Sequence, residues 1–425
     1  MVLEKYSIGI GDRFGREGQA QLRALEFARR RGASITPVWN KSNREHALIG
    51  TAPEDTRRRA DKAVRASGWP DAYFVDADHI GLKTVDKFVL SCDFFTIDVA
   101  AFIGQPPRAE TMTAFLRAAA GFKGTLRIPG LDGPIEATEV LLADVALKYL
   151  RAVEEAGRVY RHIAEKKGPA DFVTEVSFDE AHSPQTPEEL LFILAAVANE
   201  RIPLETIAPK FPGAFLKGVD YAGDVREFAR DFEADLAVLE FAKQKFGLPP
   251  GLKLSVHSGS DKFSLYPVMH RAIVEREAGL HLKTAGTTWL EEVIGLAASG
   301  GKGLRLAKDL YAGAMARFDE LAEPYRAVIA INRRELPSPK DVASWSAEKF
   351  VETLQHDPTC PRFNGQFRQL LHISFRLAAE MGDRFTDLLE ENRETIETHV
   401  TDNLLRRHIG PLFLGGPTPA GASGG

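Results

Sequence analysis

The sequence predicts a (β/α)8 barrel of the TIM type, with an insertion at its rim and a helical C-terminal region. Two observations predict this fold: short β-branched or aromatic runs recur over the first 300 residues, and helical stretches separate most of them. Strands that alternate with helices form parallel sheets, and eight such units match the usual size of this barrel. A doubly wound sheet shows the same alternation and is the alternative.

The predicted strands are short, and most end in polar or reactive residues. They are Tyr6–Asp12, Ser34–Asn40, Ala72–His79, Phe94–Ala100, Asp171–Ser177, Ile202–Ala208, Lys253–Ser258 and Leu280–Ala285. The helices between them follow from apolar periodicity and from end signals such as Thr-Pro before acidic residues. They include Gly18–Arg31, Thr56–Ala66, Thr186–Asn199 and Asp224–Phe246.

The chain divides at changes in this pattern. Residues 1–300 are predicted to form the barrel, and residues 101–168 are too long for one crossover, which indicates an inserted hairpin followed by a helix. No convincing strand follows Trp289, so residues 301–412 are predicted to be a helical C-terminal region. Residues 413–425 are rich in Gly, Pro and Ser and are predicted to be a disordered tail.

The composition excludes several classes of protein. A formal net charge of −5 does not suit a nucleic-acid-binding protein, and two cysteines are too few for a disulfide framework or a Cys-rich zinc module. The sequence lacks both a long apolar run and the apolar core of a signal peptide, so we expect no membrane role and a cytoplasmic location. The expected partner is a small molecule, and a homo-oligomer is left open.

The glycine-rich segment after the first strand does not match the dinucleotide-binding motif. From Gly9 the spacing is G-x-G-x-x-F, because Phe14 stands where the third glycine is required. We expect instead that these glycines let the chain turn over the barrel rim. The turn would then offer backbone N–H groups to an anion.

Polar side chains gather at the carboxyl ends of the predicted strands, where barrels of this type carry their active sites. Among them, His79, His257 and His281 lie on or at the ends of strands. Three protein ligands with an open position are typical of catalytic metal sites, so these histidines predict a divalent metal site, with Glu175 or Asp78 as alternative ligands. Each histidine could equally be a hydrogen-bonded structural residue. His281 begins its strand and is expected to lie lower in the barrel.

Paired carboxylates are the second signal of chemistry. Asp76 and Asp78 share a strand face, as do Glu175 and Asp179 if that strand continues, although Asp76 and Asp179 also suit capping or ion pairing. An acid and a base on opposite sides of a substrate are what proton transfer requires. Lys283 could bind an anion or, if burial lowered its pKa, form a Schiff base.

Several segments together resemble the tagaturonate/fructuronate epimerase family. They are SIGIGDRFG, PVWNKSNREH, YFVDADHIGLKTVD, DFFTIDVA, TEVSFDEA, SVHSGSDKFSLYP and KTAGTTWLEE. The resemblance implies an isomerase that interconverts two keto-hexuronates at C4 with a divalent metal ion (Mn, Ni, Zn or Mg), and some relatives act on tagatose and fructose. It also implies that Asp78, His79 and His257 lie in active-site motifs.

The chemistry of this reaction limits the mechanism. The C4 proton of a 2-ketose is β to the carbonyl and not acidic, so we expect retro-aldol cleavage and re-addition, or a stepwise carbonyl migration. We expect His79, His257 and His281 to bind the metal, and Asp78 and Glu175 to act as the acid–base pair. The expected substrate-binding residues are Arg13, Lys41, Asp98, Ser258, Lys262 and Lys283.

Two other functions stay open at this point. One is a metal-dependent aldolase or ketose isomerase on the same barrel, which would differ in its product. The other is a non-catalytic sugar-acid-binding protein, which would need fewer acid–base groups at the strand ends.

Overall fold

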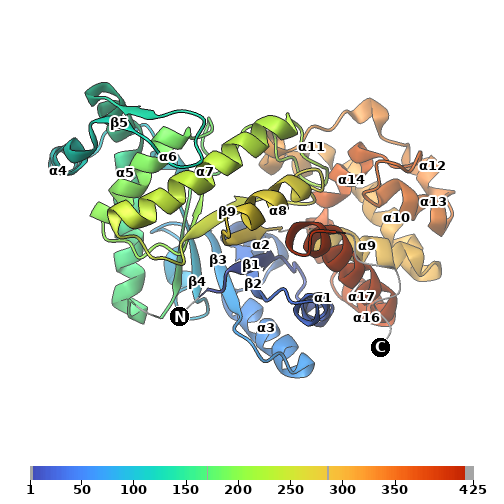
Figure 1. Cartoon of the computed structure of the whole chain (residues 1–425). Helices are drawn as coiled ribbons and strands as arrows, with labels where there is room; N and C mark the ends of the chain where they lie inside the picture. The colour runs from blue at the N-terminus through green and yellow to red at the C-terminus, as the bar shows by residue number, and fades with distance from the viewer. Residues whose placement is uncertain (1–2, 170, 285–286, 417–425) are drawn as a thin grey trace.

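The computed structural model, which describes residues 3–169, 171–284 and 287–416, contains a closed barrel of eight parallel strands (Figure 1). The order around the barrel is β1-β10-β9-β8-β7-β4-β3-β2, so neighbours in the barrel are neighbours in sequence once the inserted strands are set aside. The strands are β1 (Tyr6–Ile10), β2 (Ile35–Ser42), β3 (Phe74–Ile80), β4 (Phe94–Asp98), β7 (Val173–Ser177), β8 (Thr206–Ala208), β9 (Lys253–His257) and β10 (Leu280–Lys283). The predicted barrel is confirmed, and a doubly wound sheet is excluded.

Helices pack around the strands. They are α1 (Gly18–Arg30), α2 (Asn43–Ile49), α3 (Pro53–Ser67), α5 (Glu139–Lys167), α6 (Pro187–Asn199), α7 (Val225–Phe246), α8 (Tyr266–Glu275) and α9 (Thr287–Ala298). Local sequence fixes their ends: Thr186 and Glu189 form a reciprocal capping box at the start of α6, and the Asp224 side chain caps α7.

The insertion after β4 projects from one end of the molecule, at the upper left in Figure 1. It contains α4 (Ala109–Ala119) and the antiparallel hairpin of β5 (Gly124–Leu126) and β6 (Ile135–Ala137). The hairpin and the following helix α5 lie where the sequence predicts them.

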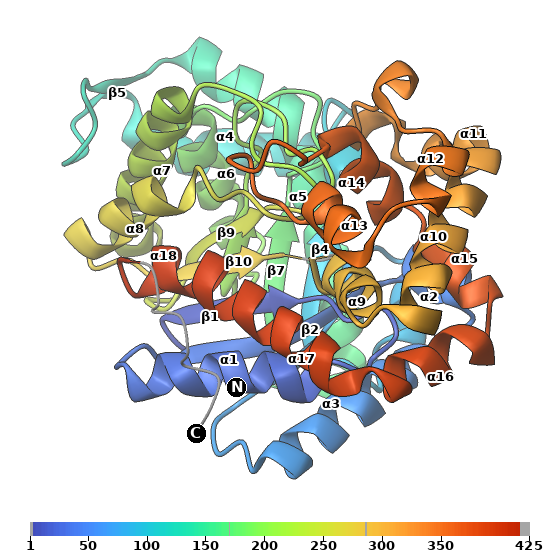
Figure 2. The ribbon, with the colours of Figure 1, turned by 90° about the vertical axis from the view of Figure 1, so that its right-hand side faces the viewer.

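The C-terminal region is helical and lies on the other side of the barrel (Figures 1 and 2). Its helices are α10 (Gly301–Ala316), α11 (Phe318–Ala322), α12 (Pro339–Ala343), α13 (Ala347–Leu354), α14 (Gly365–His372), α15 (Phe375–Glu380), α16 (Asp383–Glu391), α17 (Arg393–Asp402) and α18 (Gly410–Phe413), with a π-helical turn at Asn403–Ile409. The helix expected at 324–334 is only two short 3-10 turns. Backbone groups there bond elsewhere: the Val328 carbonyl accepts from the Lys217 N–H, and Ala330 bonds the Gln369 side chain.

The barrel and the C-terminal region share helix α9. Trp289 and its neighbours on α9 belong to the apolar core of the C-terminal region, and the Trp289 indole donates to the Leu371 carbonyl at 2.8 Å. The end of the chain returns to the barrel, where the ring of Phe413 lies 5.2 Å from that of Tyr6. The described chain is therefore packed at Phe413, where the sequence predicts the tail to begin, and residues 417–425 of that tail lie outside the described residues. Among the described helices, none combines the length and apolar character that crossing a membrane requires.

Helix α9 also buries an ionisable group whose titration opposes folding. Both carboxyl oxygens of Glu292 lack a hydrogen-bond partner among the described residues, and burial, followed by the charges of Glu17 and Asp12, raises the pKa of Glu292 well above its usual value of 4.5. The folded chain therefore holds a proton that the unfolded chain releases above about pH 4.5, so stability falls as the pH rises.

We expect Glu292→Gln to remove this penalty, because the neutral amide has nearly the same shape. The gain in unfolding free energy over the wild type should be small at pH 5 and should grow by up to about 1.4 kcal/mol per pH unit toward pH 8. Urea unfolding of both proteins at pH 5, 6.5 and 8 measures it. A gain that does not change with pH would contradict this assignment.

Candidate active site

The centre of the barrel is polar, and Lys283 on β10 organises it. The Lys283 ammonium lies 2.9 Å from Asp76, 2.9 Å from Asp78 and 3.3 Å from Glu175, and it donates to the Thr96 hydroxyl at 2.6 Å. Inward-facing positions of this fold are usually apolar, so a charged network here indicates function.

The charge state of Lys283 follows from this network. Burial lowers the pKa of Lys283, but the charges of Asp76, Asp78 and Glu175 outweigh burial and raise it well above 10.5. A lysine held in its ammonium form has no free electron pair, so these surroundings do not favour a Schiff base on Lys283. Lys283 instead neutralises and positions the carboxylates.

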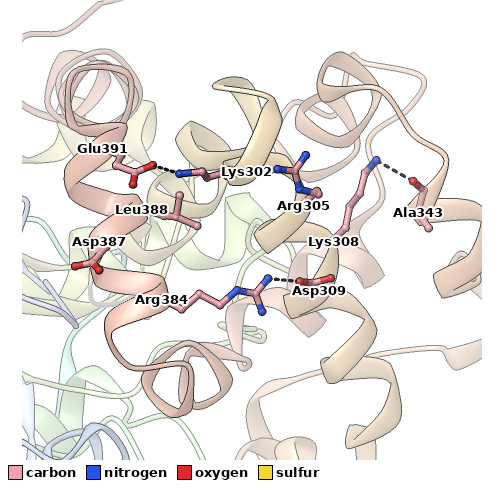
Figure 3. Close-up of a pocket in the computed structure, with 9 residues that line it drawn as sticks. All are labelled: Lys302, Arg305, Lys308, Asp309, Ala343, Arg384, Asp387, Leu388 and Glu391. Carbon is pink, nitrogen blue, oxygen red and sulfur yellow. Dashed lines mark hydrogen bonds and ion pairs between the residues drawn. The ribbon is translucent and has the colours of Figure 1, made fainter.

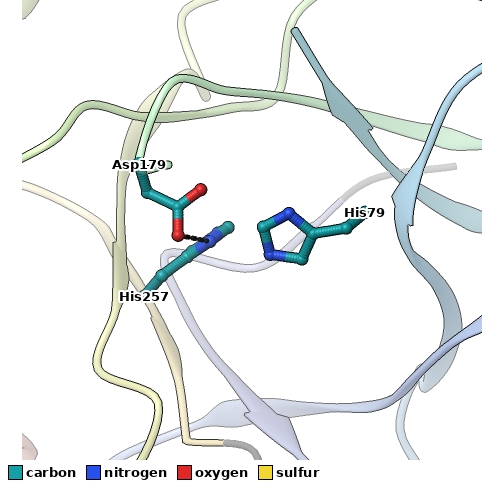
Figure 4. A group of neighbouring side chains, drawn as sticks. All are labelled: His79, Asp179 and His257. Carbon is teal, nitrogen blue, oxygen red and sulfur yellow. Dashed lines mark ion pairs between the residues drawn. The ribbon is translucent and has the colours of Figure 1, made fainter. Parts of the chain in front are cut away.

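His257, at the end of β9, lies between two carboxylates. Its Nε2 atom is 2.8 Å from Glu175 Oε1. Its Nδ1 atom is 3.0 Å from Asp179 Oδ2, the pair that Figure 4 shows. Burial lowers the pKa of His257, but Asp179 and Glu175 raise it to about 9. Glu175 is completely buried and also accepts from the Thr206 hydroxyl at 2.7 Å, so its position is fixed.

His79 reaches the same place through an irregular backbone. Strict alternation along β3 would send His79 to the face opposite Asp78, but the pairing of β3 with β4 shifts in register between Ala77 and Ile80, and His79 has φ 51°. Left-handed backbone is costly for a residue with a side chain and is concentrated at functional sites. The shift places the His79 ring 5.3 Å from that of His257.

His79, Asp179 and His257 each offer a ligand atom within 4.8 Å of the others, which is the spacing of a metal site. The buried Nδ1 of His257 faces Asp179 without the geometry of a hydrogen bond and has no such partner among the described residues. An unsatisfied nitrogen beside a carboxylate is what a site built for a cation would show, so these residues fit the implied metal. His79 forms a second such group with Asp98 and Glu180.

His281, the third predicted ligand, is placed elsewhere. It lies two residues below Lys283 on β10, its Nδ1 atom is 2.9 Å from the Ser7 hydroxyl, and its ring packs on Phe94. Burial lowers the pKa of His281 to about 3, so it is neutral. It belongs to neither candidate metal group.

Asp179 lies outside the predicted set of metal ligands, although the sequence carries a signal for it. Glu175, Ser177 and Asp179 follow the period-two spacing of one strand face, but the strand itself ends at Ser177. The Ser177 hydroxyl donates to Asp179 and keeps its carboxylate on that face.

The glycine-rich turn after β1 binds an anion that the chain itself provides. The carboxylate of Asp12 accepts the N–H groups of Gly15, Arg16 and Glu17. The expectation that these amides face an outside anion is therefore corrected.

Arg13 and Lys41, two of the expected substrate contacts, already have partners within the protein. Arg13 forms a buried ion pair with Glu45, and its guanidinium lies 4.0 Å from the centre of the Phe375 ring. The Lys41 ammonium donates to the Arg13 carbonyl at 2.8 Å, and burial lowers its pKa to about 8. Lys41 shares its strand face with Trp39, whose indole donates to α1, so this face points away from the barrel interior.

The opposite face of β2 brings Asn40 into the barrel beside Asp76. The Asn40 amide is buried, and neither its oxygen nor its nitrogen has a hydrogen-bond partner among the described residues. A buried amide without partners at this place is a candidate for binding a substrate hydroxyl.

Ser258 and Lys262, also expected to contact substrate, are engaged in the structure. The Ser258 hydroxyl donates to the Lys283 carbonyl at 2.8 Å. The Lys262 ammonium is fully buried and donates to the carbonyls of Leu216 and Val219 at 3.0 and 2.8 Å. Both positions suit a structural role. Asp98 differs, because it is partly exposed and lies 3.4 Å from His79 Nδ1.

A separate cavity of about 500 Å³ lies in the C-terminal region (Figure 3). Its charged side chains are largely paired with each other: Arg384 with Asp309, and Lys302 with Glu391. It is remote in the fold from the strand ends, and we assign it no part in the chemistry.

The cluster of histidines, carboxylates and a charged lysine at the carboxyl ends of the strands defines a (β/α)8-barrel enzyme. Comparison with known proteins gives the family. The model of the tagaturonate epimerase family matches residues 1–412, and the chain belongs to this family of isomerases.

Individual relatives agree with this family. The chain is 27% identical over 420 residues to the tagaturonate/fructuronate epimerase of Thermotoga maritima, with 95% of this chain and 80% of that protein covered. A glycerol-complexed crystal structure of the fructuronate-tagaturonate epimerase from Cohnella laeviribosi matches with a TM-score of 0.79 and 25% identity, covering 97% of this chain and 82% of that one. Its native crystal structure gives a TM-score of 0.77 at 26% identity over 96% and 81% of the two chains. The predicted family and enzyme class are confirmed.

Proposed function

We propose that this protein is a divalent-metal-dependent epimerase that inverts C4 of a keto-hexuronate and so interconverts fructuronate and tagaturonate. Family membership supports the reaction class. The observation that carries the proposal is the group of His79, Asp179 and His257, which lies against the Asp78–Lys283 pair inside the barrel mouth.

His79, His257 and Asp179 would hold the metal, with Asp179 in place of the lower-lying His281. A site of imidazole nitrogens and a carboxylate suits manganese, nickel and zinc. Magnesium prefers oxygen ligands such as the carboxylate. When bound, the ion would act as a Lewis acid that stabilises negative charge on substrate oxygens.

Inversion of C4 without a redox cofactor is achieved by breaking and re-forming the C3–C4 bond. A base takes the proton of the C4 hydroxyl, the C3–C4 electron pair becomes part of a C2–C3 enediolate, and C4 becomes an aldehyde carbon. The aldehyde then rotates, so that C3 attacks the opposite face of C4 when the bond re-forms. The proton returns to the new C4 hydroxyl.

Asp78 is the proposed base. Burial raises the pKa of Asp78, but Lys283 and His79 outweigh burial and lower it to about 2, so the carboxylate is ionised. Its ion pair with Lys283, at 2.9 Å, holds the carboxylate in one orientation. Positioning of this kind lets a weak base act on a bound hydroxyl.

Glu175 has a positioning role in this proposal in place of the expected acid–base role. Its oxygens lie 2.8 Å from His257, 3.3 Å from Lys283 and 2.7 Å from the Thr206 hydroxyl. These partners occupy both oxygens of a fully buried carboxylate, so Glu175 orients His257 and Lys283. Asp98 and Asn40 are the proposed contacts for substrate hydroxyls.

The experiment that tests this function uses EDTA-stripped protein. Fructuronate is added with manganese, nickel, zinc or magnesium one at a time, and the products are identified by NMR. We expect tagaturonate to form only when a suitable metal is present. An aldehyde fragment or an aldose as the product would indicate the aldolase or isomerase alternative, and fructuronate binding without any product would indicate a sugar-acid-binding protein.

A further inference from the structure

We propose that Lys217, together with His372, forms the subsite that binds the substrate's carboxylate. This inference rests on the proposed function, because it assigns the part of the site that recognises a hexuronate over a neutral ketose. Neither residue is among those predicted from the sequence.

The four cations predicted to contact the substrate are already neutralised or turned away. Lys283 is surrounded by three carboxylates, Arg13 is paired with Glu45, and Lys262 is bonded to backbone carbonyls. Lys41 lies on the outer face of β2 and donates to a carbonyl. Among the described residues, the Lys217 ammonium has neither a hydrogen-bond partner nor an ion-pair partner, and the Lys217 side chain is half-buried.

The loop that carries Lys217 is held by contacts on successive residues. The Leu216 carbonyl accepts from Lys262, the Lys217 N–H donates to the Val328 carbonyl, and the Gly218 N–H donates to the Ser260 hydroxyl. The Gly218 carbonyl in turn accepts from the fully buried Arg368 at 2.7 Å. These contacts fix the backbone of the loop before a ligand arrives, which lowers the entropic cost of binding.

The Lys217 side chain extends over the loop that follows β9. A Cβ atom added to Gly259 would lie 3.1 Å from the Lys217 ammonium, and Gly259 is two residues beyond the proposed metal ligand His257. Gly259 also has a positive φ of 66°, so the loop provides both the turn and the space for the lysine. The ammonium is thus next to the site, displaced from the metal group.

The surroundings of Lys217 favour an added negative charge. Burial lowers the pKa of Lys217, and the charges of Arg13 and Arg44 lower it further, while Glu45 and Asp78 act in the opposite sense. An anion that binds among neighbouring cations relieves their mutual repulsion, so its binding is favourable.

His372 gives a second, independent indication of a ligand. His372 lies on α14 and is 1% exposed. A Cβ atom added to Gly218 would lie 3.3 Å from the Cβ atom of His372. Neither ring nitrogen has a hydrogen-bond partner among the described residues, and burial together with the charges of Arg13 and Lys217 keeps the ring neutral. A buried ring with an unused donor, packed against the loop that carries an unpaired ammonium, is suited to binding a carboxylate.

The test compares Lys217→Met with the wild type by two measurements: the KM and kcat for fructuronate, and the dissociation constant of fructuronate by calorimetry. Losing a charged hydrogen bond should raise KM and the dissociation constant roughly 10- to 100-fold while kcat stays within about threefold. Lys217→Arg keeps the charge and should restore most of the affinity. Lys308→Met is the control, because Lys308 is also half-buried but donates to carbonyls of the C-terminal region.

Unchanged fructuronate binding by a folded Lys217→Met protein would overturn the subsite. If that variant does not fold, His372→Phe provides the same test, with the same weakening expected and unchanged affinity again overturning the proposal. The binding measurement does not depend on turnover. A wild type that binds fructuronate without epimerising it would therefore contradict the proposed function and leave the subsite to be judged by the binding of its variants.

Discussion

His257→Ala should abolish metal binding and epimerase activity together. His257 is the residue that connects Glu175 to Asp179, and its unsatisfied Nδ1 belongs to the proposed metal group. Removal of a metal ligand should cost at least as much as removal of a residue that only orients one, so we expect a loss of at least about 100-fold in metal affinity and in kcat/KM. Metal content by elemental analysis and turnover with fructuronate measure the two effects.

The matched control for this variant is His162→Ala. His162 also pairs with an aspartate, Asp86 at 2.6 Å, but lies on the surface of α5. It should keep full metal content and full turnover. His281→Gln distinguishes the proposed ligand Asp179 from the sequence-predicted ligand His281. This variant should also retain the metal, because His281 is not a ligand in the proposed set. A His257→Ala protein with full metal content and full turnover would exclude the assignment.

Arg368→Leu should cause the largest loss of stability. The buried carboxylate of Asp261 lies 2.8 Å from Arg368, 2.9 Å from His356 and 3.1 Å from His408, so it ties the loop after β9 to three segments of the C-terminal region. Removing one partner of a buried ion pair leaves an uncompensated charge and costs about 3–5 kcal/mol. Urea unfolding at pH 7 measures this loss.

Arg362→Leu is the control for that measurement. Arg362 pairs with Glu352 on the surface of the same region, where an ion pair contributes at most about 1 kcal/mol. Equal destabilisation by the two substitutions would contradict the stabilising role assigned to the Asp261 cluster. Because Arg368 also binds the Gly218 carbonyl, Arg368→Leu should in addition raise the KM for fructuronate.

The strands were predictable because their signal is local. Each barrel strand is a short apolar run whose end is marked by polar residues, and all eight lie within the predicted segments to within a few residues. The histidines at the ends of β3 and β9 followed from the same signal. The helix expected at 324–334 failed because its backbone bonds to the barrel loop and to α14, which is a tertiary effect.

The remaining site residues depend on choices that local sequence does not determine. On β2, sequence reasoning favoured the charged Lys41 over Asn40, but the alternation of faces turns Lys41 outward and Asn40 inward. Asp179 lies beyond the end of its strand. Lys217 lies in an irregular loop with no periodic pattern, and its position is set by Arg368 and Val328 from the C-terminal region.

The most direct test of the account follows fructuronate by NMR in D2O with metal-loaded protein. Cleavage and re-formation of the C3–C4 bond keeps the original hydrogen on C4, so we predict that tagaturonate appears with protium at C4. Deuterium at C4 would contradict this mechanism and indicate stepwise carbonyl migration. The absence of tagaturonate with every metal would contradict the proposed function itself.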